Sequence, residues 1–219
     1  DEIPKDKWAV CPTFISLFEE DQMVTDLAKK VWDKYQFELF EEVILESMSY
    51  LFSENRDVQQ MVARAFANAI ETKGWVEFVV RESSKEFARR TKHKHGFAYF
   101  LKLCVGNLNT DLVLETIELI LDKGMREQNS ELRDQLVEVG IQILNKHGEH
   151  HVDSVFQILE TRTESQEEHL RHASVVMLGF LAGFFGAEDS RIENTLELLL
   201  KALDIPSDML ASTVSRCLP

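Results

Sequence analysis

Histidine is the residue type in this sequence with the most obvious potential for chemistry. Three of the seven histidines, His147, His150 and His151, lie close together, and His169 and His172 are spaced i, i+3 on a predicted helix. Imidazole nitrogens bind zinc and transfer protons near neutral pH. However, the sequence has no His-Glu-x-x-His motif and no Cys/His pair with zinc-finger spacing. We therefore expect no metal site and no cofactor.

Other motifs that carry out chemistry are missing from the sequence. There is no Gly-x-Ser-x-Gly motif, no glycine-rich phosphate-binding loop, and no cysteine near a base at a helix start. Glu41, Glu42 and Glu46 lie on the solvent side of an apolar stripe, which is typical of a solvated helix face. We therefore expect no catalytic residues, and the sequence favours a binding protein over an enzyme.

A basic stretch from residue 81 to residue 95 is the best candidate for a functional site. Its cations are Arg81, Lys85, Arg89, Arg90, Lys92 and Lys94. With Glu82 and Glu86, the stretch has a local charge of +4, although the whole chain has a formal net charge of -14. An acidic chain repels nucleic acid on average, so DNA binding is not expected. The stretch is predicted to contact RNA or an acidic partner, or else to be a solvated connection between helices. It lacks the interleaved aromatic residues that would support stacking of a single strand.

The composition is typical of an intracellular globular protein. Cys11, Cys104 and Cys217 are odd in number and far apart, which indicates reduced thiols and a cytoplasmic location. The longest uncharged apolar run, residues 173–187, is shorter than the roughly 20 residues that span a bilayer, so it predicts a buried central helix and no membrane contact. No signal peptide opens the chain, and both ends suggest an internal segment of a longer protein.

Apolar residues recur at helical spacing along most of the chain. One stripe contains Val43, Ile44, Met48 and Leu51; another contains Val113, Ile117, Ile120 and Leu121; a third contains Leu132, Leu136, Val139 and Ile143. Capping-box spacing at Ser165–Glu168 and Ser190–Glu193 predicts helix starts. The glycines expected to end helices in left-handed conformation are Gly74, Gly124, Gly148 and Gly186.

The second helices of the predicted pairs repeat at a nearly constant interval. Their first inward apolar residues, Val58, Leu132, Leu170 and Met209, are separated by 74, 38 and 39 residues, and a missing member of the series falls near residue 95. A period of about 37–39 residues per helical hairpin is the signature of HEAT-type arrays. The sequence therefore predicts an all-α, HEAT-type α-solenoid with about four complete helical hairpins.

The predicted organisation begins with a degenerate helical entry over residues 1–38. HEAT-like repeats follow over 39–204, with approximate boundaries at 39–72, 74–108, 110–147 and 149–186, and a last partial repeat begins at 189. Residues 205–219 are predicted to form a truncated terminal helix. Because one hairpin cannot bury its own apolar face, we expect the stability of such an array to come from stacking between neighbours.

Three segments go beyond generic HEAT patterning: residues 144–160 (LNKHGEHHVDSVFQILE), 173–182 (ASVVMLGFLA) and 206–219 (PSDMLASTVSRCLP). In order and spacing they resemble conserved segments of the general-control translational activators, a family of giant ribosome-associated proteins, and residues 27–33 (LAKKVWD) resemble an earlier helix more loosely. The sequence departs from the usual Asp-Val-Arg at Asp57-Val58-Gln59, so we expect an incomplete polar ladder between repeats.

The resemblance implies a non-catalytic scaffold segment of a cytoplasmic regulator that activates the starvation-responsive kinase of translation initiation. It implies association with the ribosome, through protein or ribosomal RNA. The kinase and an ATP-binding-cassette protein would be partners of other parts of the longer protein. The alternative is a segment of another HEAT scaffold, such as a nuclear transport receptor or a phosphatase scaffold, that binds protein partners.

Overall fold

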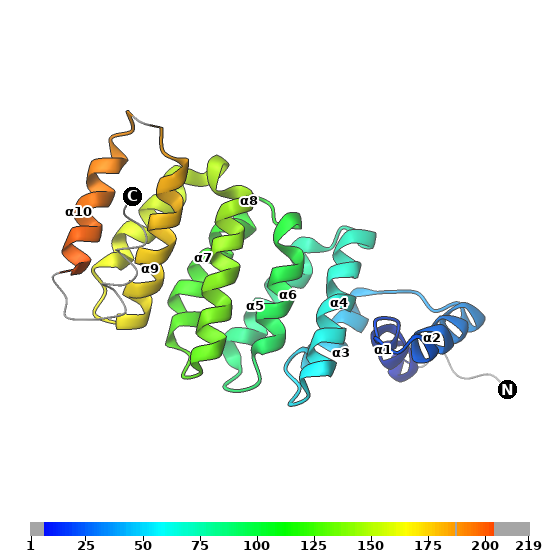
Figure 1. The fold of residues 1–219 in the computed structure, drawn as a ribbon. Coiled ribbons are helices and arrows are strands. Elements are labelled where there is room, and N and C mark those ends of the chain that lie inside the picture. The colour runs from blue at the N-terminus through cyan, green and yellow to red at the C-terminus, as the bar shows by residue number, and fades with distance from the viewer. Residues whose placement is uncertain (1–6, 187, 204–219) are drawn as a thin grey trace. The chain divides into compact units, whose positions relative to one another are not determined.

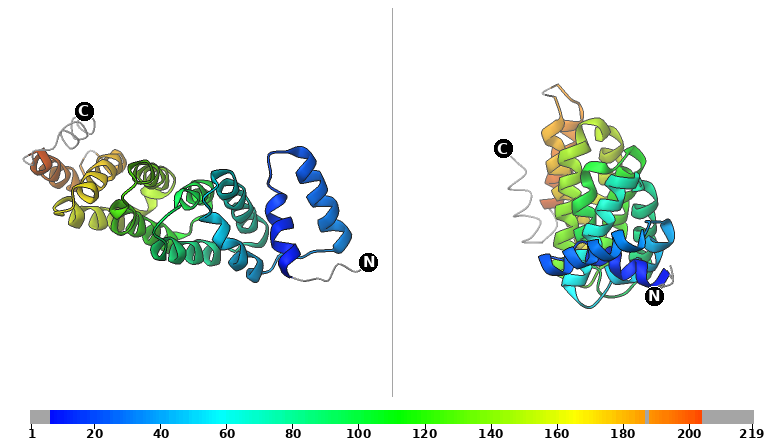
Figure 2. Two further views of the ribbon diagram at one scale, coloured as in Figure 1. Left: turned by 90° about the horizontal axis from the view of Figure 1, so that it is seen from below. Right: turned by 90° about the vertical axis from the view of Figure 1, so that its right-hand side faces the viewer.

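The structure of the chain is a computed structural model that describes residues 7–186 and 188–203. Within these ranges the chain forms ten α-helices and three short 3-10 helices, with no β-strands (Figures 1 and 2). The chain divides into two compact units, residues 1–107 and 108–219. An all-α fold of helical hairpins confirms the predicted fold class. Among the described residues, no helix combines the length and the apolar character that crossing a bilayer requires.

The first unit contains three helical hairpins. Its elements are α1 (Lys7–Ser16), α2 (Gln22–Tyr35), α3 (Glu41–Leu51), α4 (Arg56–Lys73), α5 (Val76–Arg89), α6 (His95–Cys104) and the 3-10 helix η1 (Val105–Asn107). Helix α4 packs on α3 in its own hairpin and, most extensively, on α6 of the next. The unit is therefore held together by contacts within hairpins and by contacts between successive hairpins.

Aromatic side chains fill the core between α4, α5 and α6. Phe66 and Phe100 are fully buried and meet edge to face, with ring centroids 5.9 Å apart. Phe87 and Phe97 are stacked at 4.6 Å. Removing one such ring from a core costs about 3–5 kcal/mol, so these pairs fix the three helices against one another.

Polar caps set the helix boundaries in this unit. The Asn55 side chain accepts hydrogen bonds from the amides of Asp57 and Val58, which starts α4. Gly74 ends α4 at φ 70°, which confirms the left-handed conformation predicted there. The first apolar stripe is also confirmed, because Val43, Ile44, Met48 and Leu51 are all buried on α3.

The longest element of the second unit, α8, consists of two helices that meet across a kink. Its elements are α7 (Thr110–Asp122), η2 (Gly124–Arg126), α8 (Ser130–Thr163), α9 (Glu168–Leu181), η3 (Ala182–Phe184) and α10 (Arg191–Leu203). Helix α8 is kinked at His151, which has φ −126° and ψ 16°, and it packs on both α7 and α9. Gly148 does not end the helix in the predicted left-handed conformation, because the first of the two helices in α8 runs three residues further, to the break at His151. Gly148 is instead buried in α8 against the Phe184 ring.

The predicted capping box at Ser165 is also wrong. Helix α9 begins at Glu168, and its N-cap residue is Glu167, which makes no side-chain cap. The Ser165 hydroxyl accepts a hydrogen bond from the Glu167 amide at 3.1 Å, so it stabilises the turn before the helix. At the start of α10, the Asp189 carboxylate accepts from the Arg191 amide.

The second helices of four hairpins share one polar contact. In each of the helices α2, α4, α8 and α9, the side chain of the fourth residue donates a hydrogen bond to the backbone carbonyl oxygen six residues earlier. The pairs are Thr25 to Glu19, Gln59 to Ser53, Arg133 to Glu127, and Arg171 to Ser165. Gln59 also donates to the His93 carbonyl at 3.0 Å, so it connects α4 to the loop between α5 and α6. The glutamine that departs from the family pattern therefore still links two hairpins.

The repeat boundaries remain a prediction, since the helices alone do not define where each repeat begins. Helix α3 and all of α4 except its last residue, Lys73, fall within the predicted repeat 39–72, and α5 and α6 fall within 74–108. Residues 205–219, predicted to form a terminal helix, lie outside the described residues, as do residues 1–6 of the predicted entry.

Candidate contact surface on helix α5

Helix α5 carries most of the predicted contact residues because one of its faces is buried. Val79, Val80, Ser83 and Phe87 lie in the core, and the Ser83 hydroxyl is satisfied by the Val80 carbonyl at 3.0 Å. A helix with 3.6 residues per turn then directs the side chains of positions 78, 81, 85 and 89 away from that core. The structure thus brings Arg81, Lys85 and Arg89 onto one exposed stripe.

Each cation on this stripe has a carboxylate on the same helix. Arg81 pairs with Glu77, Lys85 with Glu82 at 2.6 Å, and Arg89 with Glu86 at 3.2 Å. Such i, i+3 and i, i+4 pairs stabilise an exposed helix by about 0.2–0.5 kcal/mol each. The pairs are weak enough to be exchanged for contacts with a partner.

The remaining cations lie at the end of α5 and in the following loop. The Arg90 guanidinium lies 5.3 Å from the centroid of the Phe52 ring and pairs with Glu86 at 3.3 Å. Lys94 is only 6% exposed, and its ammonium lies 4.4 Å from the centre of the Phe87 ring. Lys92 is exposed in the loop. Lys94 is therefore buried against an aromatic ring, which its charge alone did not predict.

The loop backbone is also tied to its neighbours. His93 has φ 58°, and its carbonyl accepts from Gln59. Its ring lies 3.5 Å from the Glu54 carboxylate. Five exposed or partly exposed cations and the three carboxylates of α5 remain on this surface. The net charge of this surface is therefore about +2, because Lys94 of the basic stretch is buried and Glu77, which lies outside the stretch, adds a carboxylate.

Two aromatic residues at the start of α5 belong to the same surface. Trp75 and Phe78 are partly exposed and meet edge to face, with centroids 6.3 Å apart and ring planes at 81°. Together with Arg81, Lys85, Glu77, Glu82 and Gly74 they line an open pocket of about 410 Å³. The basic stretch begins at Arg81, so sequence reasoning missed both rings. Their spacing of i−6 and i−3 from Arg81 on a predicted helix was the available signal.

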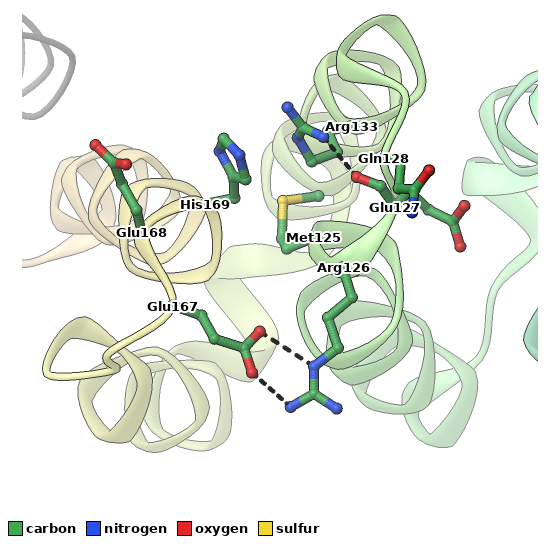
Figure 3. A pocket seen from close by; sticks show the side chains of 8 residues that line it. All are labelled: Met125, Arg126, Glu127, Gln128, Arg133, Glu167, Glu168 and His169. Carbon is green, nitrogen blue, oxygen red and sulfur yellow. Dashed lines mark hydrogen bonds and ion pairs between the residues drawn. The ribbon is translucent and has the colours of Figure 1, made fainter.

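A second pocket, of about 620 Å³, lies in the C-terminal unit between η2 and the start of α9 (Figure 3). Along one side, Arg126 and Glu167 form two contacts of 3.1 and 2.9 Å. Arg133 donates to the Glu127 carbonyl, and His169 lies across from it. Two arginines and three glutamates give the lining a mixed charge that selects neither an anion nor a cation.

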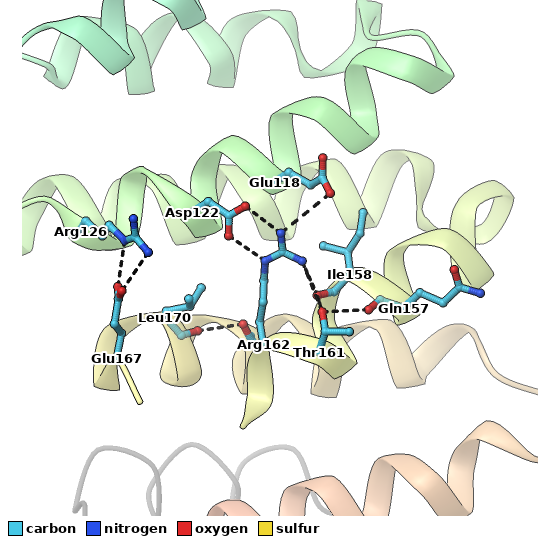
Figure 4. A network of polar contacts seen from close by, with 10 residues as sticks. Glu118, Asp122, Arg126, Gln157, Ile158, Thr161, Arg162, Glu167 and Leu170 are labelled. Carbon is cyan, nitrogen blue, oxygen red and sulfur yellow. Dashed lines mark hydrogen bonds and ion pairs between the residues drawn. The ribbon is translucent and has the colours of Figure 1, made fainter. Parts of the chain in front are cut away.

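A bidentate ion pair in the C-terminal unit joins α7 to the second half of α8 (Figure 4). Arg162 donates from Nε and Nη2 to the two carboxylate oxygens of Asp122, at 2.8 and 2.7 Å, and Glu118 lies 3.9 Å away. The hydrogen bond from Arg162 lowers the pKa of Asp122 below its ordinary value, against the opposing effect of partial burial. This network fixes a helix–helix contact and has no ligand-binding geometry.

Histidine and cysteine side chains do not assemble into a reactive centre within the described ranges. No group of three or more potential metal ligands occurs there. His151 has a lowered pKa because of burial and of its neighbours His147 and His150. Cys104 is buried, and burial raises its thiol pKa to about 12, so it is a poor nucleophile at neutral pH.

Comparison with known proteins places this arrangement in a family. Over residues 2–76 and 75–183, the sequence matches the family described as stalled ribosome sensor GCN1, HEAT repeats. These two ranges cover most of the chain. It belongs to the GCN1 HEAT-repeat family. Known solved structures give no significant match.

Several known proteins resemble the chain, over about half to nearly all of its length. Protein ILITYHIA of Arabidopsis thaliana is 24% identical over 94% of the chain and 8% of its own length. Stalled ribosome sensor GCN1 of Homo sapiens is 20% identical over 92% of the chain and 9% of its own length. The eIF-2-alpha kinase activator GCN1 of Saccharomyces cerevisiae is 27% identical over 49% of the chain and 4% of its own length. The chain thus spans less than a tenth of the length of each of these relatives.

The GCN1 match decides between the two kinds of scaffold that the sequence left open. It confirms the resemblance to the translational activators and gives no support to a transport receptor or a phosphatase scaffold. HEAT repeats, an all-α fold and GCN1 relatives together establish a HEAT-repeat scaffold segment. The predicted contact residues on α5 remain a prediction.

Proposed function

We propose that this chain is a non-catalytic HEAT-repeat segment through which a much longer cytoplasmic protein associates with the ribosome. The observation that carries the proposal is the family match over residues 2–183, because the related proteins are named as a sensor of stalled ribosomes and as an activator of the eIF-2-alpha kinase. In this proposal the segment holds and spaces other parts of the longer protein. Kinase activation and contact with an ATP-binding-cassette protein occur elsewhere along it.

The contact of this segment with the ribosome is proposed to involve the exposed cations of α5 and its loop. Arg89 is the most exposed arginine of the stripe, at 73% of its side chain, and Lys92 is exposed in the loop. A local basic surface on an acidic chain limits contact to one orientation, since the rest of the chain repels ribosomal RNA. Arg90 and Lys94 also hold the fold through Phe52 and Phe87, so they are unsuitable for testing this contact.

The test is co-sedimentation of the chain with purified cytoplasmic ribosomes over a range of salt concentrations. The variant Arg89→Glu/Lys92→Glu reverses two exposed charges, and we expect it to bind about tenfold more weakly with a flatter salt dependence. Lys29→Glu/Lys30→Glu on α2 is the matched control, because it makes the same change in formal charge at two exposed lysines.

The outcomes separate three cases. Loss of binding in the α5 variant alone supports the proposal. Equal losses in both variants would mean that only the total charge matters. A wild-type chain that stays in the supernatant at low salt, with stalled as well as with translating ribosomes, would refute ribosome association by this segment.

A further inference from the structure

Three large apolar side chains are exposed on α3 and at its start. Phe40 is the N-cap residue of the helix, Leu45 lies at its middle and Tyr50 lies near its end. Their exposed fractions are 52%, 47% and 43%. The opposite face of α3 is buried in contacts with α1, α4 and α5. Residues 40–50 thus present apolar area to solvent that the core of the first unit does not use.

Helical spacing joins these side chains into one face. The exposed positions of α3 occur as adjacent pairs one turn apart, at 41 and 42, 45 and 46, and 49 and 50. Leu45 therefore lies one turn beyond Glu41. In the adjacent row, Tyr50 lies one turn beyond Glu46. Apolar groups and carboxylates alternate along this face, because residues four apart are neighbours on a helix surface.

The charge of this face is negative throughout. No lysine, arginine or histidine occurs between Lys34 and Arg56, whereas five glutamates do. Within the part of the chain that the structure describes, the carboxylates of Glu41, Glu42 and Glu46 form no ion pair or hydrogen bond. The cations of α5 already have carboxylate partners, but these three carboxylates are available to the cations of another molecule without competition.

We propose that this surface, the α3 face, binds a basic amphipathic helix of a partner protein. The residues of the α3 face are Phe40, Glu41, Glu42, Leu45, Glu46 and Tyr50. Apolar side chains at helical spacing on the partner cover the three apolar residues, and lysines or arginines between them pair with the glutamates. The contact goes beyond the proposed ribosome contact, which lies on α5, and does not depend on it.

The backbone of the partner favours a helix over an extended segment. An extended segment binds best at the edge of a sheet, where its backbone groups find hydrogen-bond partners. The described residues form no sheet, and the α3 face offers side chains alone. A helix satisfies its own backbone hydrogen bonds, so it can cover an apolar surface without leaving them unpaired.

Charge selects a basic helix among the possible occupants. Nucleic acid and anionic membranes carry phosphates, which unpaired carboxylates repel. A neutral apolar helix would remove the charges of the α3 face from water without placing cations beside them, at a cost that opposes binding. A basic amphipathic helix supplies both the apolar area and the opposite charge.

The experiment is a display selection of random pentadecapeptides on the intact chain, after removal of peptides that also bind the Leu45→Ala chain. We expect the enriched peptides to be net basic, with apolar residues three and four positions apart. A synthetic peptide from this set should bind about tenfold more weakly to Leu45→Ala, since burial of the leucine is lost. It should bind about fivefold more weakly to Glu42→Gln/Glu46→Gln, which lacks two of the charges.

The matched control is Glu71→Gln/Glu149→Gln, which removes the same charge at two exposed glutamates outside the α3 face and should leave peptide binding unchanged. All substituted side chains are exposed, so we expect every variant to keep the fold, and circular dichroism can confirm this. Chemical shifts of an isotope-labelled peptide should show that it becomes helical on binding.

The outcomes decide the proposal separately from the proposed function. Enriched peptides without a positive net charge, or an absence of peptides that require Leu45, would overturn it. Equal losses in the α3 variant and in the control would also overturn it, because the peptide would then respond to total charge alone. A peptide that binds in extended form would exclude the helical partner. Peptide binding by a chain that fails to sediment with ribosomes would refute the proposed function and leave the α3 face intact.

Discussion

Replacement of Gly96 by alanine should destabilise the first unit, because there is no room for a methyl group where α6 meets α4. A Cβ on Gly96 would lie 2.8 Å from the Gln59 Cβ and still closer to the Leu51 carbonyl oxygen. Carbon atoms rarely approach within 3.0 Å, and a backbone oxygen cannot turn aside as a side-chain end can. The clash can be relieved only by moving α6 away from α3 and α4.

The magnitude follows from the contacts that this movement disturbs. Overpacking a core costs about 1–3 kcal/mol, and weakening the hydrogen bond from Gln59 to the His93 carbonyl adds about 1 kcal/mol. Alanine regains up to about 1 kcal/mol through its higher helix propensity. We therefore expect a net loss of about 2 kcal/mol, or a decrease in the Tm of the first unit of about 8–16 °C.

The matched control is Gly140→Ala in the second unit. Its new Cβ would meet the methyl end of Met177, which can change rotamer at a cost of about 0.5–1.5 kcal/mol, roughly what alanine regains in the helix. Tryptophan fluorescence isolates the effect, since all three tryptophans, Trp8, Trp32 and Trp75, belong to the first unit. A Gly96→Ala chain that unfolds at the wild-type midpoint, or a larger loss in Gly140→Ala, would refute the reasoning.

Two further predictions concern ionisable groups. Arg162→Ala should cost about 1–2 kcal/mol because it removes the paired hydrogen bonds to Asp122. Since Arg162 lowers the folded-state pKa of Asp122, its stabilisation is complete above the ordinary value of 3.8 and is lost as pH falls through the lower folded value. The wild-type and variant free energies of unfolding should therefore converge in acid, and a constant difference in urea titrations would contradict this. Cys104, with a thiol pKa of about 12, should resist iodoacetamide at pH 8 until urea is added, as peptide mass spectrometry can show; rapid labelling of the folded chain would disprove its burial.

The helices could be predicted because apolar spacing reflects burial directly. Val113, Ile117, Ile120 and Leu121 recur at helical intervals in the sequence, and all four are buried on α7. The same pattern holds for the first half of α8, where Leu132, Leu136, Val139 and Ile143 are buried. A period of 3.6 residues requires no knowledge of the neighbouring helices, so one sequence is enough to detect it.

Helix boundaries were harder to predict because several polar side chains compete for the same backbone amides. The spacing Ser165–Glu168 satisfies the capping-box pattern, but Ser165 caps the turn before α9 and the helix starts three residues later. Gly148 has no cap to make, since α8 continues through it and bends at His151. In both cases the packing of the neighbouring element decides among local options of similar energy.

The candidate contact surface depended on where neighbouring side chains lie in space, which a count of charges along the sequence does not show. The residue type of Lys94 predicted a surface cation, but its side chain is buried and its ammonium packs on the Phe87 ring. Trp75 and Phe78 lay outside the basic stretch, and only the start of α5 places them beside Arg81. A count of charged residues along the sequence therefore includes the buried Lys94 and omits the two aromatic residues.

Both differences between the predicted and the observed α5 surface weaken its attraction for a polyanion. Burial of Lys94 and the carboxylate partner of each α5 cation reduce the attraction for a polyanion, while the two rings add apolar area that RNA phosphates cannot use. The salt dependence of ribosome binding by this chain should therefore be shallow, equivalent to the release of only a few counterions, and a steep dependence in the co-sedimentation measurement would contradict this.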